Sequence, residues 1–135
     1  MNTLGSLMLA SAAPQRLHDW YTTVLPPAEV TTVGDYQILR YGAFFLFLDR
    51  RDDVGSHNLE PGRFLLNFDV EDARAVADRI EASGATWVSP LEDRDGSLFA
   101  TAADPDGNYV QVIQLSEAHR AEMAESAPAD QPASV

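Results

Sequence analysis

The chain has 135 residues, of which 45% are hydrophobic and 22% are charged, as is typical of one soluble globular domain. Its formal net charge of −12 argues against a nucleic-acid partner, because proteins that bind a phosphate backbone present a basic patch. The sequence contains neither cysteine nor lysine, which excludes disulfides, thiolate nucleophiles and Schiff-base lysines.

Hydropathy predicts neither a membrane segment nor a secretory leader. No run of residues is long and apolar enough for a membrane helix, and no basic stretch precedes an apolar one at the N-terminus. We therefore expect a cytoplasmic protein with no membrane partner. The acidic balance is compatible with a cationic ligand, although surface acid also serves solubility alone.

The first half of the chain predicts a strand, a helix and further strands. Apolar residues recur at helical spacing after Pro14, and the pair Pro26-Pro27 ends that pattern. A later aromatic and aliphatic stretch is suited to a buried strand. In chain order we expect a strand at 5–11, a helix at 14–25, a turn at 33–35 between short strands, strands at 36–40 and 43–48, and a polar linker at 51–62.

The second half predicts the same order of elements. Its last strand follows the turn Asp104-Pro105-Asp106-Gly107-Asn108, in which proline presets φ and the glycine tolerates positive φ. The final strand then alternates two sets of side chains. The expected elements are a strand at 63–70, a helix at 71–83, a short strand from 87, a turn at 92–96, a strand at 97–102 and a strand at 109–115.

The two halves therefore predict an internal repeat. Residues 7–13 align with 66–72, and 42–48 align with 107–113. We expect an α+β fold in which two βαβββ repeats form a cupped mixed sheet with the helices on its convex side. The predicted organisation is one domain at 1–115, with repeats at about 4–50 and 63–115 and the linker at 51–62, followed by an acidic Ala/Pro-rich tail at 116–135 that starts as a helical turn and ends disordered.

Three segments give the chain a resemblance to a known group. They are the turn at 104–108, Trp20-Tyr21-Thr22-Thr23-Val24-Leu25 in the first helix and Phe68-Asp69-Val70-Glu71-Asp72 at the second repeat. With them the chain resembles the vicinal oxygen chelate superfamily of glyoxalases, extradiol dioxygenases and bleomycin-resistance proteins. The resemblance implies the fold more specifically than the function, because this scaffold supports unrelated activities.

Enzymes of that superfamily hold a divalent metal with His, Gln or Glu near the start of the first strand and in the middle of the last strand of each repeat. The resemblance places those positions at Ser6, Leu46, Leu65 and Gln111. Two leucines, a serine and one amide are a poor ligand set for a divalent cation. We therefore expect a metal-free member of the group, with no cofactor.

The histidines do not suggest a replacement site. His18, His57 and His119 fall on the first helix, the linker and the tail, and no two have ligand-like spacing. The sequence therefore assigns no catalytic residue. His57 keeps some interest because the linker could fold over the cup, and the sequence leaves that open.

The predicted cup has an apolar, partly aromatic lining with a few polar groups, which is the usual make-up of a small-molecule pocket. Gln111 is expected to bond a ligand, or alternatively to satisfy Asn67 within an ordinary core. The candidate ligand-binding residues are Ser6, Met8, Phe44, Leu46, Leu65, Asn67, Asp69, Tyr109, Gln111 and Ile113.

Three functions are compatible with these residues. The favoured hypothesis is a metal-free protein resembling the bleomycin-resistance branch, which captures a hydrophobic or aromatic small molecule. A variant of this hypothesis has a ligand that is also cationic. The second is a glyoxalase-like lyase or isomerase, or another enzyme on the same scaffold. The third is a non-catalytic assembly module. In each case exposed sheet edges favour a homodimer.

Overall fold

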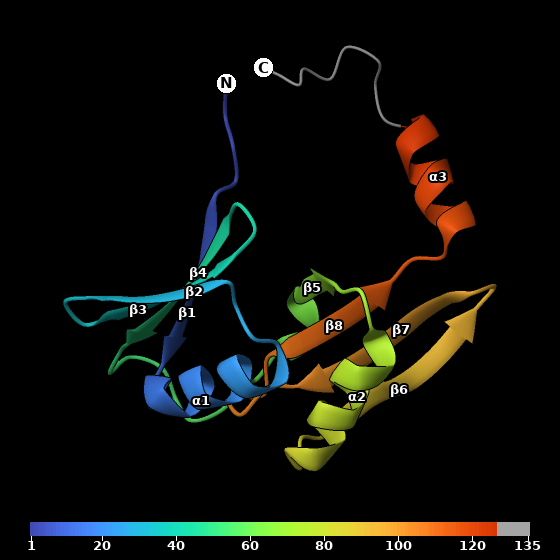
Figure 1. Ribbon diagram of the computed structural model, residues 1–135. Coiled ribbons are helices and arrows are strands. Elements are labelled where there is room, and N and C mark those ends of the chain that lie inside the picture. The colour runs from blue at the N-terminus through green and yellow to red at the C-terminus, as the bar shows by residue number, and fades with distance from the viewer. Residues whose placement is uncertain (127–135) are drawn as a thin grey trace.

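The computed structural model describes residues 1–126 (Figure 1). Two segments, each of one strand, one helix and three strands, are joined by the linker. The first repeat contains β1 (Ser6–Ser11), α1 (Pro14–Val24), β2 (Glu29–Val33), β3 (Tyr36–Tyr41) and β4 (Phe44–Arg50). After a 3₁₀ turn (Pro61–Arg63), the second contains β5 (Leu65–Asp69), α2 (Ala73–Ala82), β6 (Trp87–Arg94), β7 (Ser97–Ala103) and β8 (Tyr109–Gln114), and α3 (Glu117–Ser126) follows.

The strands form two separate four-stranded mixed sheets. Sheet A has the order β1-β4-β3-β2 and sheet B has the order β5-β8-β7-β6. In each sheet the first strand of the repeat pairs in parallel with the last, and the remaining pairs are antiparallel. The predicted α+β fold of two βαβββ repeats is therefore confirmed.

Each sheet buries one face under a helix. Leu9 and Leu48 of sheet A lie in one core cluster with Leu17 of α1, and Val112 of sheet B lies in the same cluster with Ile80 of α2. Strand side chains alternate between faces, so the intervening residues form a second surface, which we call the open face of each sheet. Within residues 1–126, neither α1 nor α2 packs on an open face. α3 lies by the open face of sheet B, where His119 bonds Ser97 and Met123 lines a hollow together with Phe99.

The two repeats meet through their helices, which lie side by side in Figure 1. The indole N–H of Trp20 donates to Ser83 Oγ over 3.1 Å, and Arg79 Nε donates to the carbonyl of Val24 over 3.0 Å. These contacts connect α1 with α2 and fix how the two sheets are disposed around one shared core.

The helix ends follow from local chemistry. Pro14 occupies the first turn of α1, where its missing N–H costs nothing. Asp72 caps α2 by accepting the backbone N–H of Ala75 over 3.0 Å, and Gln114 of β8 accepts the N–H of Ala73 over 2.7 Å. One cap is therefore local in sequence, while the other reaches α2 from the neighbouring sheet.

Two elements differ from the sequence-based expectation. β6 continues to Arg94, and the reversal is made by Asp95 (φ 54°) and Gly96 (φ 93°) alone, because two residues of positive φ fit the twist of a tight hairpin. The tail begins with the helix α3 rather than a single helical turn, and its predicted disordered end lies outside the described residues. No helix within residues 1–126 is long and apolar enough to cross a membrane.

Candidate functional site

The open face of sheet B unites six of the predicted ligand-binding residues. Strand β5 pairs with β8 so that Leu65 faces Tyr109, Asn67 faces Gln111 and Asp69 faces Ile113. The pair Asn67–Gln111 is the central one, and its two amides can each donate and accept hydrogen bonds. Leu65, Tyr109 and Ile113 lie next to it on this face, together with the polar Asp69 and Thr101, so the face mixes apolar and polar groups as small-molecule sites do.

The open face of sheet A differs from the prediction. Ser6 and Met8 of β1 lie on it, as expected, and Met8 is 46% exposed. Leu46, however, is 1% exposed and lies in the core cluster under α1. The prediction that Phe44 and Leu46 line the open face is therefore wrong, because β4 presents Phe45 and Phe47 there instead.

A shift of one residue explains this error. Met8 pairs with Phe47 in the first repeat at the place where Asn67 pairs with Gln111 in the second, so Phe47 rather than Leu46 is the structural counterpart of Gln111. Aligning Gly42 with Gly107 is misleading because the first closes a two-residue hairpin and the second belongs to a longer turn. A slip of one residue moves every side chain of a strand to the opposite face.

An apolar hollow of about 730 Å³ lies beside β5, between the two repeats. We call it the β5 hollow. Its volume falls within the range of about 300–1,000 Å³ that is usual for ligand pockets. Phe44 and Leu46 reach it from the covered side of β4, and Leu65, Asn67 and Asp69 reach it from β5. Five predicted residues thus meet in one hollow, although Gln111, Tyr109, Ile113, Ser6 and Met8 lie outside its lining.

Asn67 and Asp69 provide the polar groups that the β5 hollow offers to a ligand, because the Tyr41 hydroxyl, which also lines it, donates to the carbonyl of Leu25. Both belong to an edge strand, so they border the hollow and the open face of sheet B together. Most of the remaining lining is hydrocarbon or aromatic. A ligand bound here would bury an apolar body and meet one amide and one carboxylate.

The residues at the superfamily's metal positions do not suit a divalent ion. With the register corrected, they are Ser6, Phe47, Leu65 and Gln111, so two of the four side chains have no donor atom. The other two provide a hydroxyl and an amide oxygen, and neither has a negative charge to balance a cation. Within residues 1–126, no three His, Asp or Glu side chains gather elsewhere in a way that could hold a metal.

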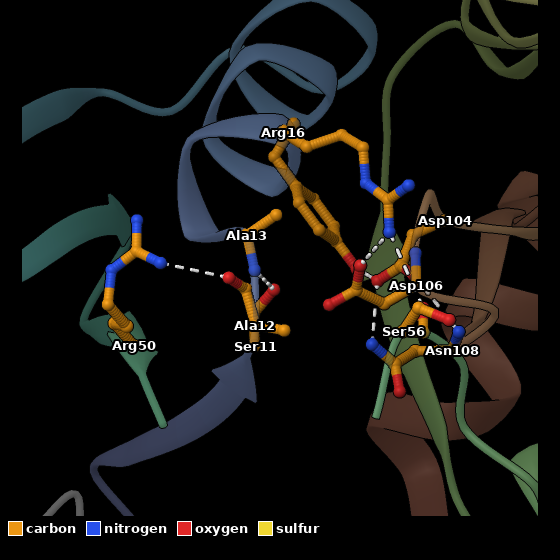
Figure 2. Close-up of polar contacts among 10 residues, drawn as sticks. Ser11, Ala12, Ala13, Arg16, Arg50, Ser56, Asp104, Asp106 and Asn108 are labelled. Atoms are coloured by element: carbon orange, nitrogen blue, oxygen red, sulfur yellow. Dashed lines mark hydrogen bonds and ion pairs between the residues drawn. The ribbon is translucent and has the colours of Figure 1, made fainter. Parts of the chain in front are cut away.

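The turn at 104–108 joins the two repeats (Figure 2). Asp104, which is 4% exposed, accepts the hydroxyl of Tyr21 over 2.7 Å, two backbone N–H groups within the turn, and the amide of Asn108. Arg16 of α1 forms an ion pair with Asp106 over 2.7 Å. The most specific motif of the sequence therefore acts as an anchor for α1.

Burial governs the protonation of this anchor. It raises the pKa of Asp104 above the ordinary 3.8, and the hydrogen bonds from Tyr21 and Asn108 oppose that shift. Burial, together with the Asp104 carboxylate, also raises the pKa of Tyr21 well above its ordinary value. The turn thus holds a desolvated carboxylate, with the Tyr21 hydroxyl as donor.

The linker lies against the same turn. Asn58 donates its backbone N–H to the carbonyl of Asp106 over 2.8 Å and its side-chain amide to Asn108 over 3.0 Å. His57 faces a hollow that Met8 also lines, so the linker runs past the open face of β1. His18 hydrogen-bonds Gln15 on α1, and His119 bonds the hydroxyl of Ser97, so the three histidines remain apart.

Sequence reasoning missed Phe45 and Phe47 on the open face. The whole stretch 44–48 is apolar, so alternation within it gives no direction. The polar Asp49 was the available signal, because it shares its parity with Phe45 and Phe47 and pairs with Ala10 on the open face.

Comparison with known proteins gives one family and several fold relatives. A family model described as a glyoxalase-like domain matches residues 6–113. A lactoylglutathione lyase of Pseudomonas aeruginosa is 38% identical over 68 residues, which cover 48% of this chain and 38% of the lyase, so the match spans well under half of that relative.

Solved structures share the fold at low identity. A glyoxalase-related enzyme from Fulvimarina pelagi is 18% identical with a TM-score of 0.69, covering 85% of this chain and 89% of the other. The fosfomycin resistance protein FosX from Mesorhizobium loti is 13% identical with a TM-score of 0.69, covering 90% of this chain and 98% of the other.

Proposed function

The chain belongs to the glyoxalase-like domain family of the vicinal oxygen chelate superfamily, and from that premise we propose that it is a metal-free small-molecule-binding protein. The proposed ligand is hydrophobic or aromatic, and it occupies the β5 hollow with its polar group toward Asn67 and Asp69. By sequestering such a compound, the protein would act in the manner of bleomycin-resistance proteins and serve antibiotic resistance.

One observation supports this proposal most strongly. The β5 hollow has about 730 Å³ of space and a mainly apolar lining, and its polar side chains within residues 1–126 are Asn67, Asp69 and Tyr41, whose hydroxyl already donates to the carbonyl of Leu25. Those features suit binding more than catalysis, because the Tyr41 hydroxyl is held by the carbonyl of Leu25 and Asp69 is the one carboxylate that lines the hollow within residues 1–126. The carboxylate of Asp69 would favour a cationic group on the ligand.

We also propose that the protein is a homodimer. β1 and β5 each pair on one side only, so both sheets have a free edge where the two repeats adjoin. Met8 at 46% and Phe45 at 38% exposed, both on the open face of sheet A, add an apolar surface that a second copy would cover. Size-exclusion chromatography with light scattering tests this, and a monomer at micromolar concentration would contradict it.

The binding proposal is tested with a filled hollow. Ala28 is exposed and lines the β5 hollow, so Ala28→Phe places a ring in the space the ligand needs. Ala82→Phe adds the same ring on the exposed surface of α2 and is the matched control. The probe is the neutral fluorophore N-phenyl-1-naphthylamine, titrated into chelator-treated protein.

We expect saturable binding to the wild-type protein and to Ala82→Phe, and an affinity lowered at least about tenfold in Ala28→Phe, because the ring occupies the apolar volume. Equal affinity in the two variants would reject the β5 hollow as the ligand site. A wild-type protein that binds no probe would favour the assembly-module alternative, in which the same apolar surfaces serve contacts between chains.

A glyoxalase-like lyase is the second candidate, and the match to a lactoylglutathione lyase favours it. Such an activity would need a metal held unusually, because the superfamily positions here contain Ser6, Phe47, Leu65 and Gln111. Elemental analysis of protein isolated without chelator, combined with an assay of lactoylglutathione lyase activity, separates the candidates. Stoichiometric metal with turnover that a chelator abolishes would establish the lyase.

A further inference from the structure

A second hollow, of about 680 Å³, lies away from the proposed ligand site. Four segments form it: α1, the linker, the connection between α2 and β6, and the turn that precedes β8. It shares no lining residue with the β5 hollow. We call it the tryptophan hollow, because Trp20 and Trp87, the two tryptophans of the whole sequence, both line it.

The indole groups present fixed apolar surface. Trp20 donates its ring N–H to Ser83 over 3.1 Å, and Trp87 donates its own to Glu81 over 2.8 Å. Both polar ends are thus satisfied within the protein. Trp87 is partly buried and offers ring surface to the hollow, whereas Trp20 is 8% exposed and adds a smaller apolar area. Such surface favours an aromatic or flat aliphatic ligand body.

Arg16 and His57 bring hydrogen-bond donors to the hollow. Arg16 uses Nη2 for Asp106 and for the carbonyl of Ser56, while its Nε and Nη1 have no acceptor among the described contacts. The His57 ring also has no hydrogen-bond partner within residues 1–126. Each of these groups can donate to an anionic oxygen.

Within residues 1–126, no free carboxylate lines the hollow, although the chain has a net charge of −12. Asp104 is the one acidic residue of that described part in the lining, and it is buried and already accepts hydrogen bonds from Tyr21, Asp106 and Asn108. An anion entering the tryptophan hollow therefore meets unpaired donors and a guanidinium that can form a second, charge-assisted contact.

We propose that the tryptophan hollow is a second binding site and that it takes an aromatic monocarboxylate. The ring of the ligand lies against Trp20 and Trp87, and its carboxylate meets Arg16, with His57 as a further donor. The site is independent of the β5 hollow and of any metal.

The test uses the two indole N–H signals in a ¹⁵N–¹H spectrum of the full chain, since each reports on one wall of the hollow. The probes are phenylacetate and its neutral counterpart phenylacetamide. We expect both indole signals to shift saturably with phenylacetate, and the amide to bind at least about tenfold more weakly, because it cannot form the charged contact.

Three variants test whether Arg16 itself, rather than a general change in net charge, binds the carboxylate of the ligand. Arg16→Gln should weaken phenylacetate binding about tenfold, whereas Arg74→Gln, which removes the same charge from the exposed surface of α2, should leave it unchanged. Asp106→Asn releases Arg16 from its ion pair and should tighten binding. The spectra themselves report whether each variant is folded.

Equal binding of acid and amide would overturn the proposal, as would equal losses in Arg16→Gln and Arg74→Gln, or indole signals that do not move. Ala28→Phe, which fills the β5 hollow, should leave phenylacetate binding intact. A loss in that variant would mean that the two hollows are one site, which would also overturn the proposal without affecting the proposed function.

Discussion

Removing the hydroxyl of Tyr21 should expose how much the turn at 104–108 contributes to stability. The ring of Tyr21 is fully buried, so Tyr21→Phe keeps the packing and deletes only the 2.7 Å hydrogen bond to Asp104. A hydrogen bond to a charged group contributes about 1.5–3 kcal/mol, so we expect that loss in the free energy of unfolding at pH 7. Urea titrations followed by tryptophan fluorescence measure it.

The pH dependence gives the sharper result. Burial places the folded pKa of Asp104 above its unfolded value, so the folded protein binds more protons between the two values and this group's contribution to stability falls as pH rises through that window. The hydroxyl of Tyr21 stabilises the ionised form. Deleting this hydroxyl should therefore lower the free energy of unfolding most above the window, and by only about 1 kcal/mol below it, where the carboxyl is neutral.

The chain provides a matched control. Tyr41 donates its hydroxyl to the neutral carbonyl of Leu25, also over 2.7 Å. Tyr41→Phe should cost about 0.5–1.5 kcal/mol at every pH, because neither partner titrates in this range. If Tyr21→Phe and Tyr41→Phe lost equal stability both at pH 7 and at pH 3, the account of Asp104 as a desolvated carboxylate held by Tyr21 would be refuted.

The corrected register and the capping of α2 make two further predictions. Leu46→Ala should cost about 2–5 kcal/mol in urea unfolding, because it empties a core position, whereas Phe47→Ala on the open face should cost much less; equal losses would contradict the register. Gln114→Ala should cost about 1 kcal/mol, because Gln114 accepts the N–H of Ala73 over 2.7 Å, and unchanged stability would show that this contact contributes nothing.

Most of the fold could be predicted because its signals are local. Pro14 and the Pro26-Pro27 pair bound the first helix in the sequence, and α1 runs from Pro14 to Val24. The repeat was visible in the order of the elements, and the two sheets have the same topology. Patterns of this kind depend on residues that are close in the sequence, so they can be recognised without knowledge of the tertiary structure.

The faces of β4 could not be predicted in the same way. Five consecutive apolar residues, 44–48, provide no alternation, so the choice between Leu46 and Phe47 depends on pairing with β1. The length of each turn decides that pairing, and the two repeats use turns of different length. The β5 hollow could not be predicted for the same reason. Phe44 and Leu46 reach it from the covered face of β4, whereas Leu65, Asn67 and Asp69 reach it from β5.

The contact between the 104–108 turn and α1 could not be predicted from the sequence either. Pro105 and Gly107 predict a turn, but the contacts of Asp104 with Tyr21 and of Asp106 with Arg16 join residues from different repeats. Nothing local indicates such partners. The motif therefore predicted the family correctly while concealing that its carboxylates serve the contact with α1.

A native mass spectrum of freshly isolated protein, recorded before and after treatment with a chelator, tests metal-free small-molecule binding most directly. The account predicts a dimer that retains an organic small molecule, with a mass that the chelator does not change. A stoichiometric divalent metal in the untreated protein, lost together with the small molecule after the chelator, would contradict it.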